Sequence, residues 1–143
     1  MQSYEQDVVA WANEQARLLR AGRFDQLDIE HIAEEIEDVG KSEQRELSSR
    51  MAVLLAHLLK WKYQPERRGA SWKITIRTQR IDIDYVIDEA PSLKSKMEEP
   101  KWLAMVWARA VAQAANETGI ATWPDECPWA IRDEVLKDEW LPD

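Results

Sequence analysis

Several kinds of residue are scarce in this sequence of 143 residues, and each scarcity excludes a class of structure. The single cysteine, Cys127, cannot form an intramolecular disulfide, so nothing indicates an oxidising compartment. Only four glycines are present, which argues against an all-β fold built on many tight turns. No apolar run approaches the length of about 18 residues that a membrane-spanning helix requires.

The N-terminal residues also lack an export signal. The stretch MQSYEQDVVAW has no basic region followed by an apolar one, so we expect a cytoplasmic protein. A chain of this length is expected to form one domain, here residues 1–143, and to bury about 70% of its unfolded surface. Phenylalanine occurs once but tryptophan eight times, and tryptophan suits both helix-packing seams and partner-facing surfaces.

Helical periodicity dominates the rest of the sequence. Apolar residues recur at helical spacing between capping and breaking residues, which predicts an all-α fold, a compact irregular bundle of about five to six helices. Ser3, Asp28 and Ser71 are predicted N-caps, and Gly22 is predicted to follow the end of the first helix. The predicted helices cover residues 3–21, 28–39, 42–64, 71–90 and 100–119, with short ones after Pro91 and over residues 129–137.

Two consecutive predicted helices carry apolar stripes that we expect to face the core. Gly40 separates them, and such a short connection predicts that they pack antiparallel. The helix over residues 100–119 is apolar almost all round, so we predict that it is the central one. The two stripes consist of Ile29, Ile32, Ala33, Ile36 and Val39, and of Leu47, Met51, Leu54, Leu55, Leu58 and Trp61.

The segment from 71 to 90 is apolar on two sides. Its stretch KITIRT alternates like a strand, but twenty residues without a turn signal exceed a typical strand and favour a helix. A helix with two apolar faces is either sandwiched between neighbours or carries an interface. The faces consist of Trp72, Ile76, Ile83, Val86 and Ile87, and of Ile74, Ile81 and Tyr85.

The motifs, taken together, resemble a bacterial family. The pattern Tyr4-x-x-Asp7-x-x-x-Trp11-x-x-x-Gln15-Ala16-x-Leu18-Leu19-x-x-Gly22 is followed by EEIEDxGKSE, HLLKWKYQPERRGASW and PxECP. This combination resembles the "domain of unknown function 29" family over essentially the whole chain. The resemblance implies a compact all-helical fold, and it implies no settled activity and no catalytic residue.

Charge is distributed unevenly along an acidic chain with a net charge of −8. Residues 60–80 contain seven basic residues against Glu66 alone, whereas residues 28–39 contain six acidic residues and no Lys or Arg. In the favoured interpretation the two segments neutralise each other inside the protein. Alternatively, the basic segment binds nucleic acid, an acidic protein or a small anion. The candidate anion- or partner-binding residues are Arg67, Arg68, Arg77, Arg80 and Trp72.

A metal site is a second candidate. Helical bundles bind metals through carboxylates and histidines from facing helices, and Glu34, Asp38 and His57 are the candidate ligands. The acidic residues, however, lie opposite the apolar stripe of their helix, and such a charge run is usually a solvated face. We therefore expect no cofactor.

The tail DEWLPD contains Trp140, which can be buried only by folding back or by meeting another chain, and we predict that it is an interface residue. Together with the two-faced segment, it favours a protein-interaction or regulatory module without catalytic activity. The expected partner is another protein or a second copy, with no membrane contact. The alternatives are a divalent-metal-dependent hydrolase or nuclease that uses the carboxylates and histidine, and a nucleic-acid or anion binder that uses residues 60–80.

Overall fold

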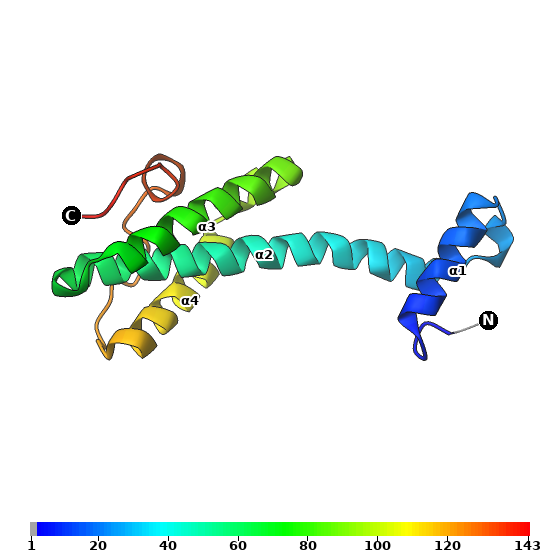
Figure 1. Cartoon of the computed structure of the whole chain (residues 1–143), viewed down its shortest axis with the longest axis horizontal. Coiled ribbons are helices and arrows are strands. Elements are labelled where there is room, and N and C mark those ends of the chain that lie inside the picture. The colour runs from blue at the N-terminus through cyan, green and yellow to red at the C-terminus, as the bar shows by residue number, and fades with distance from the viewer. Residues whose placement is uncertain (1–2) are drawn as a thin grey trace. The chain divides into compact units, whose positions relative to one another are not determined.

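The computed structural model describes residues 3–143, and this part of the chain is all-α, as predicted. Short 3₁₀ segments and one π-helical turn, η5 (Ile131–Val135), connect or follow the helices. Within residues 3–143, no helix combines the length and the apolar character that crossing a membrane requires. The α-helices are α1 (Val8–Arg20), α2 (Ile29–Tyr63), α3 (Ala70–Glu89) and α4 (Pro100–Thr118) (Figure 1).

The chain divides into two compact units, residues Met1–Ser42 and Glu43–Asp143, each with its own internal contacts. The first unit contains α1 and the beginning of α2. The second contains the remainder of α2, together with α3, α4 and the C-terminal segment. That residues 1–143 form one folding domain stays a prediction.

Helix α1 shows how local signals set its ends. Its N-cap is Asp7, not Ser3, because the Asp7 side chain accepts a backbone hydrogen bond of the first turn at 3.0 Å. The predicted end at Gly22 is confirmed. Gly22 adopts a φ of +73°, and the N–H of Arg23 donates to the carbonyl of Leu18, as in a Schellman motif.

Helix α2 is continuous through Gly40, so the predicted break at this residue is wrong. A glycine inside a helix costs only about 1 kcal/mol relative to alanine, and no proline follows to enforce a stop. Because the chain does not turn back at Gly40, residues 28–39 and 42–64 do not form the predicted antiparallel pair. The predicted stop at Pro65 is confirmed, since α2 ends at Tyr63 and Pro65 opens η2 (Pro65–Arg67).

The second half of α2 forms the centre of the second unit. Each of the six apolar residues predicted to be buried between Leu47 and Trp61 is buried. Helix α4 begins at Pro100, as predicted, but it packs by one face only, with Trp102, Val106 and Ala110 buried while the opposite side is solvent-exposed. The prediction that α4 is the central helix is therefore wrong, and α2 takes that place.

Polar contacts also connect α3 and α4 to α2 within the second unit. Arg50 of α2 pairs with Asp82 of α3 at 2.9 Å. Lys60, which is buried, pairs with Glu117 of α4 at 3.1 Å. Trp102 donates its indole N–H to the Ser48 hydroxyl at 2.9 Å. The ring of Trp102 therefore supplies apolar area between α2 and α4 while its N–H group stays satisfied.

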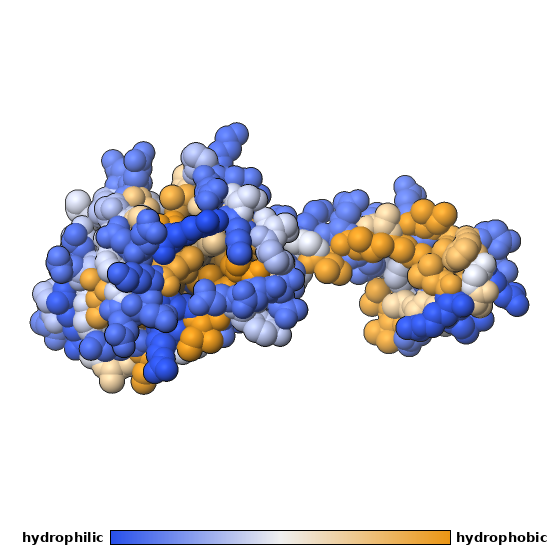
Figure 2. Space-filling view, turned by 90° about the horizontal axis from the view of Figure 1, so that it is seen from above, coloured by the Kyte–Doolittle hydropathy of each residue, from blue (hydrophilic) through white to orange (hydrophobic). Residues whose placement is uncertain are grey.

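The apolar stripe predicted for residues 29–39 is not core. Ile29, Ile36 and Val39 are 68%, 67% and 66% exposed, so the prediction that they are buried is wrong. We call these three residues the α2 stripe. Figure 2 shows apolar side chains gathered on the surface of the first unit. The stripe was predicted to pack on the following helix, and that helix does not exist as a separate element.

Helix α3 confirms that the 71–90 segment is helical and two-faced. Its N-cap position is Gly69 rather than the predicted Ser71, whose carbonyl accepts from a side chain within the helix. One face is buried in the second unit. Ile74, Ile81 and Tyr85 are 64%, 56% and 66% exposed, and we call these three residues the outer face of α3.

Candidate functional site

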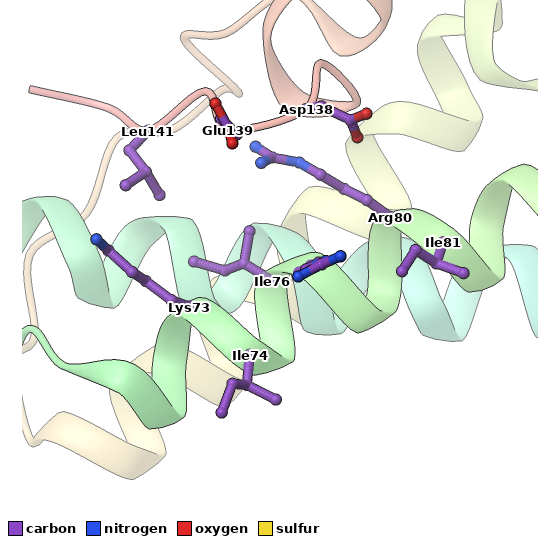
Figure 3. Close-up of a pocket in the computed structure, with 9 residues that line it drawn as sticks. Lys73, Ile74, Ile76, Arg80, Ile81, Asp138, Glu139 and Leu141 are labelled. Atoms are coloured by element: carbon purple, nitrogen blue, oxygen red, sulfur yellow. The ribbon is translucent and has the colours of Figure 1, made fainter.

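A cavity of about 840 Å³ lies between α3 and the C-terminal segment of the second unit (Figure 3). The α3 residues bring three cationic side chains and three isoleucines, and the C-terminal segment brings two acids and a leucine. A site of this kind suits an amphipathic ligand, with apolar contacts and charged groups at the rim. The lining residues are Lys73, Ile74, Ile76, Arg77, Arg80, Ile81, Asp138, Glu139 and Leu141.

Arg80 is the buried cation of this cavity, with only 4% of its surface exposed. Its Nε donates to the Val135 carbonyl at 2.8 Å and its Nη2 to the Trp140 carbonyl at 2.6 Å. Figure 3 shows its side chain extending from α3 toward the C-terminal segment. Burial lowers the pKa of Arg80, and the neighbouring charge of Asp138 opposes this shift. Arg80 therefore positions the C-terminal segment through its backbone.

The C-terminal segment turns sharply where Arg80 holds it. Glu139 adopts a φ of +65°, a left-handed conformation that is uncommon for residues with a side chain. The ring of Trp140 lies 5.8 Å from that of Trp129 and packs on the core of its own unit. Trp140 is therefore folded back on its own chain, and an additional interface role for it stays a prediction.

Arg67, Arg68 and Trp72 lie apart from this cavity, at the corner between α2 and α3. Arg68 donates to the Trp61 carbonyl at 2.7 Å, and its guanidinium lies 5.2 Å from the Trp61 ring centre. The ammonium group of Lys60 lies 5.3 Å from the ring centre of Trp72. Arg68 and Lys60 thus pair with the aromatic rings beside them, which is a stabilising cation–π arrangement.

The predicted metal ligands lie in different units. Glu34 and Asp38 belong to the first unit and His57 to the second. Over residues 3–143, no group of three or more His, Cys, Asp or Glu residues is placed to hold a metal ion. His57 instead donates its Nδ1–H to the Val53 carbonyl at 2.9 Å, and burial lowers its pKa. His57 is thus a hydrogen-bonded histidine at the edge of the core.

The first unit is organised around the carboxylate of Asp28. The indole N–H of Trp11 donates to Asp28 at 2.9 Å, and Nδ1 of His31 lies 2.7 Å from the same carboxylate oxygen. The backbone N–H of Asp28 donates to the side-chain carbonyl of Gln15 at 2.9 Å. The carboxylate thereby joins α1 to the first turn of α2.

Tyr4 closes this cluster. Its ring stacks on the His31 imidazole with a centroid distance of 4.3 Å, and its hydroxyl donates to Glu35. This hydrogen bond, together with burial and the surrounding negative charges, raises the pKa of Tyr4 to about 12. The tyrosine therefore stays neutral over the physiological range.

Residues of the N-terminal sequence motif form the cluster around Asp28. A comparison with family models assigns the chain to a family. The model of the family described as "Domain of unknown function DUF29" matches residues 3–141. The chain belongs to the DUF29 family. Comparisons with curated proteins and with solved structures find no match.

The N-terminal motif of this DUF29 chain has a structural explanation. Asp7 caps α1, Trp11 and Gln15 bond to Asp28, and Gly22 ends the helix. Sequence reasoning identified Asp28 only as a cap and missed its bonds to Trp11 and His31. The available signal was the Asp-x-x-His spacing, which places both side chains on one side of the first helical turn.

The two histidines of the chain are expected to titrate on opposite sides of the ordinary histidine pKa. The hydrogen bond to Asp28 raises the pKa of His31 above 6.5, and burial lowers that of His57 below 6.5. Proton NMR of the imidazole signals, assigned with the variant His57→Gln, measures both. Equal midpoints for the two rings would contradict the cluster described above.

The ion pair between His31 and Asp28 predicts a pH range in which the first unit is most stable. Protonated His31 stabilises it fully below pH 6.5, and this contribution is lost as the pH rises through the raised folded-state pKa. The hydrogen bond from His31 lowers the pKa of Asp28 below 3.8. The stability that ionised Asp28 contributes is therefore present above pH 3.8 and is lost as the pH falls through the lowered pKa. The stability lost in His31→Gln is therefore expected to be largest between these two values, as thermal unfolding can measure.

Proposed function

We propose that this DUF29 chain is a protein-interaction module without catalytic activity and that the α2 stripe is its contact surface. The observation that carries the proposal is the exposure of Ile29, Ile36 and Val39, large apolar side chains aligned on one side of a helix. Large exposed apolar patches on soluble proteins mark interaction sites. The first unit adds further exposed apolar side chains, namely Val8, Val9, Leu19 and Phe24.

The surroundings of Trp61 support this choice over a nucleic-acid binder. Binding of single-stranded nucleic acid relies on aromatic faces on which bases stack. Trp61 is only 8% exposed, and cations of its own chain lie against its ring. Its ring therefore offers no open face to a base.

Site-specific photo-cross-linking in cells that express the protein tests the proposal. A photoreactive amino acid at position 36, in the α2 stripe, is expected to give one or a few discrete cross-linked products, since this side chain lies within the contact. Position 34 is the matched control, because Glu34 is exposed on the opposite side of the same helix. Cross-linking at position 36 no stronger than at position 34 would overturn the proposed function.

A further inference from the structure

We infer that the partner of the α2 stripe is a second copy of this chain, in which it packs on the outer face of α3. The inference rests on the proposed function, because it names the partner of the same surface. In the resulting dimer, the segment 28–39 of each copy contacts α3 of the other copy, so the contact occurs twice.

The two surfaces match in their apolar spacing. Ile29 and Ile36 of the α2 stripe are separated by seven residues, as are Ile74 and Ile81 of the outer face of α3. Seven residues correspond to about two helical turns, or about 10 Å along a helix axis. Apolar residues at this spacing on two helices interdigitate as ridges and grooves.

The two surfaces are also complementary in charge. The α2 stripe is bordered by Glu30 and Glu37, and residues 28–39 contain six acidic residues and no Lys or Arg. The outer face of α3 contains the exposed Arg77 between its isoleucines, next to Lys73 of the cavity rim. Opposite charges at the rim of an interface favour the correct encounter and fix its register.

The charges of the two segments favour contact between unlike surfaces. Residues 28–39 contain acidic residues and no Lys or Arg, whereas the outer face of α3 carries the exposed Arg77 and Lys73 near its N-terminal isoleucine. Pairing two copies of the α2 stripe with each other would instead bring two acidic segments together, which is unfavourable.

A reciprocal contact halves the area that each helix pair must bury in a stable dimer. Specific interfaces bury about 1,200–2,000 Å² in total, so two equal contacts need to bury only about half of that each. In the closed two-fold dimer two copies use both surfaces on each other, whereas use of the two surfaces on different copies would form an open chain. The exposed apolar residues of both helices are then covered without a third component.

A charge-reversal exchange tests this arrangement in solution. Arg77→Glu alone and Glu30→Lys alone each place like charges in both contacts of their own homodimer, and each is expected to weaken dimerisation roughly tenfold or more. A mixture of the two variants restores unlike charges in both contacts of a heterodimer, because one contact keeps Glu30 opposite Arg77 and the other places the two exchanged charges opposite each other. The mixture is therefore expected to form heterodimers with the affinity of the unmodified chain, within about threefold.

Native mass spectrometry of the mixture, with one variant labelled with ¹⁵N, distinguishes heterodimers from homodimers. Arg109→Glu and Glu34→Lys are the matched controls, because they make the same charge changes at exposed positions outside the two surfaces. Circular dichroism confirms that each variant stays helical. A chain that is monomeric at every concentration, or single variants that dimerise as well as the controls, would overturn the inference.

The outcomes separate this inference from the proposed function. A cross-linked product at position 36 with twice the mass of the chain supports both. A discrete product of another mass, from a chain that remains monomeric, keeps the proposed function and overturns the second-copy inference. The absence of any specific product at position 36 overturns the proposed function itself.

Discussion

Replacing Leu54 with alanine is expected to lower the free energy of unfolding of the second unit by about 3–5 kcal/mol. Leu54 is fully buried in the half of α2 that forms the core of this unit. Truncation removes the transfer free energy of the lost carbon atoms and leaves a cavity that the surrounding α3 and α4 fill only in part. Urea unfolding followed by tryptophan fluorescence reports mainly on this unit, because Trp11 is the one tryptophan outside it.

The matched control for Leu54→Ala is Ile36→Ala. The two residues lie about five turns apart on the same side of the same helix, yet Ile36 is 67% exposed. Measured by circular dichroism at a protein concentration that keeps the chain monomeric, Ile36→Ala is expected to change stability by no more than about 0.5 kcal/mol. Equal losses in the two variants would show that the α2 stripe is part of a core.

The variant Arg80→Met is expected to lower the stability of the second unit by about 2–4 kcal/mol. It leaves the carbonyls of Val135 and Trp140 without their donor, and a buried unsatisfied carbonyl costs about 1–3 kcal/mol. Removing a buried charge offsets part of this loss. We expect limited proteolysis to cleave the C-terminal segment of the variant faster than that of the unmodified chain, because the segment loses its anchor.

Arg77→Met provides the comparison for Arg80→Met, because it removes the same charge one turn away, at an exposed position of α3. At a protein concentration that keeps the chain monomeric, it is expected to leave both the urea midpoint and the rate of proteolysis close to those of the unmodified chain. If the two variants lose the same stability, the hydrogen bonds of Arg80 to the backbone do not hold the segment.

The sequence predicted several features that depend on local chemistry, although the predicted N-caps at Ser3 and Ser71 are wrong. Gly22 and Gly119 both adopt positive φ values at helix ends, and proline marks the end of α2 and the start of α4. The buried side of residues 47–61 and the two faces of α3 follow from helical periodicity alone, because the side chains repeat every 3.6 residues.

Features that depend on distant parts of the chain were not predicted. Periodicity shows that residues 29–39 have an apolar side, but it does not tell whether the surface that covers it lies in the same chain. Gly40 illustrates a related problem, because a glycine ends a helix only when the following residues cap it, and here the helix simply continues.

The candidate site likewise combines residues that the sequence indicates with an arrangement that it does not. Sequence reasoning selected Arg77 and Arg80 from their charge and placed Arg67 and Arg68 in the same group. The structure separates the two pairs, because the cavity forms only where α3 meets residues 135–141, which lie some 55–60 residues further along the chain. Pairing across that separation leaves no local signal in either segment.

The way Arg80 holds the C-terminal segment has a consequence for how this family can diverge. Its two hydrogen bonds end on main-chain carbonyls, and every amino acid supplies such a carbonyl. Substitutions at positions 135 and 140 therefore leave the acceptors in place, although they change the packing around them. Evolutionary constraint on these two hydrogen bonds therefore falls on the single arginine, whereas positions 135 and 140 are constrained by packing, since Val135 is fully buried and Trp140 packs on Trp129.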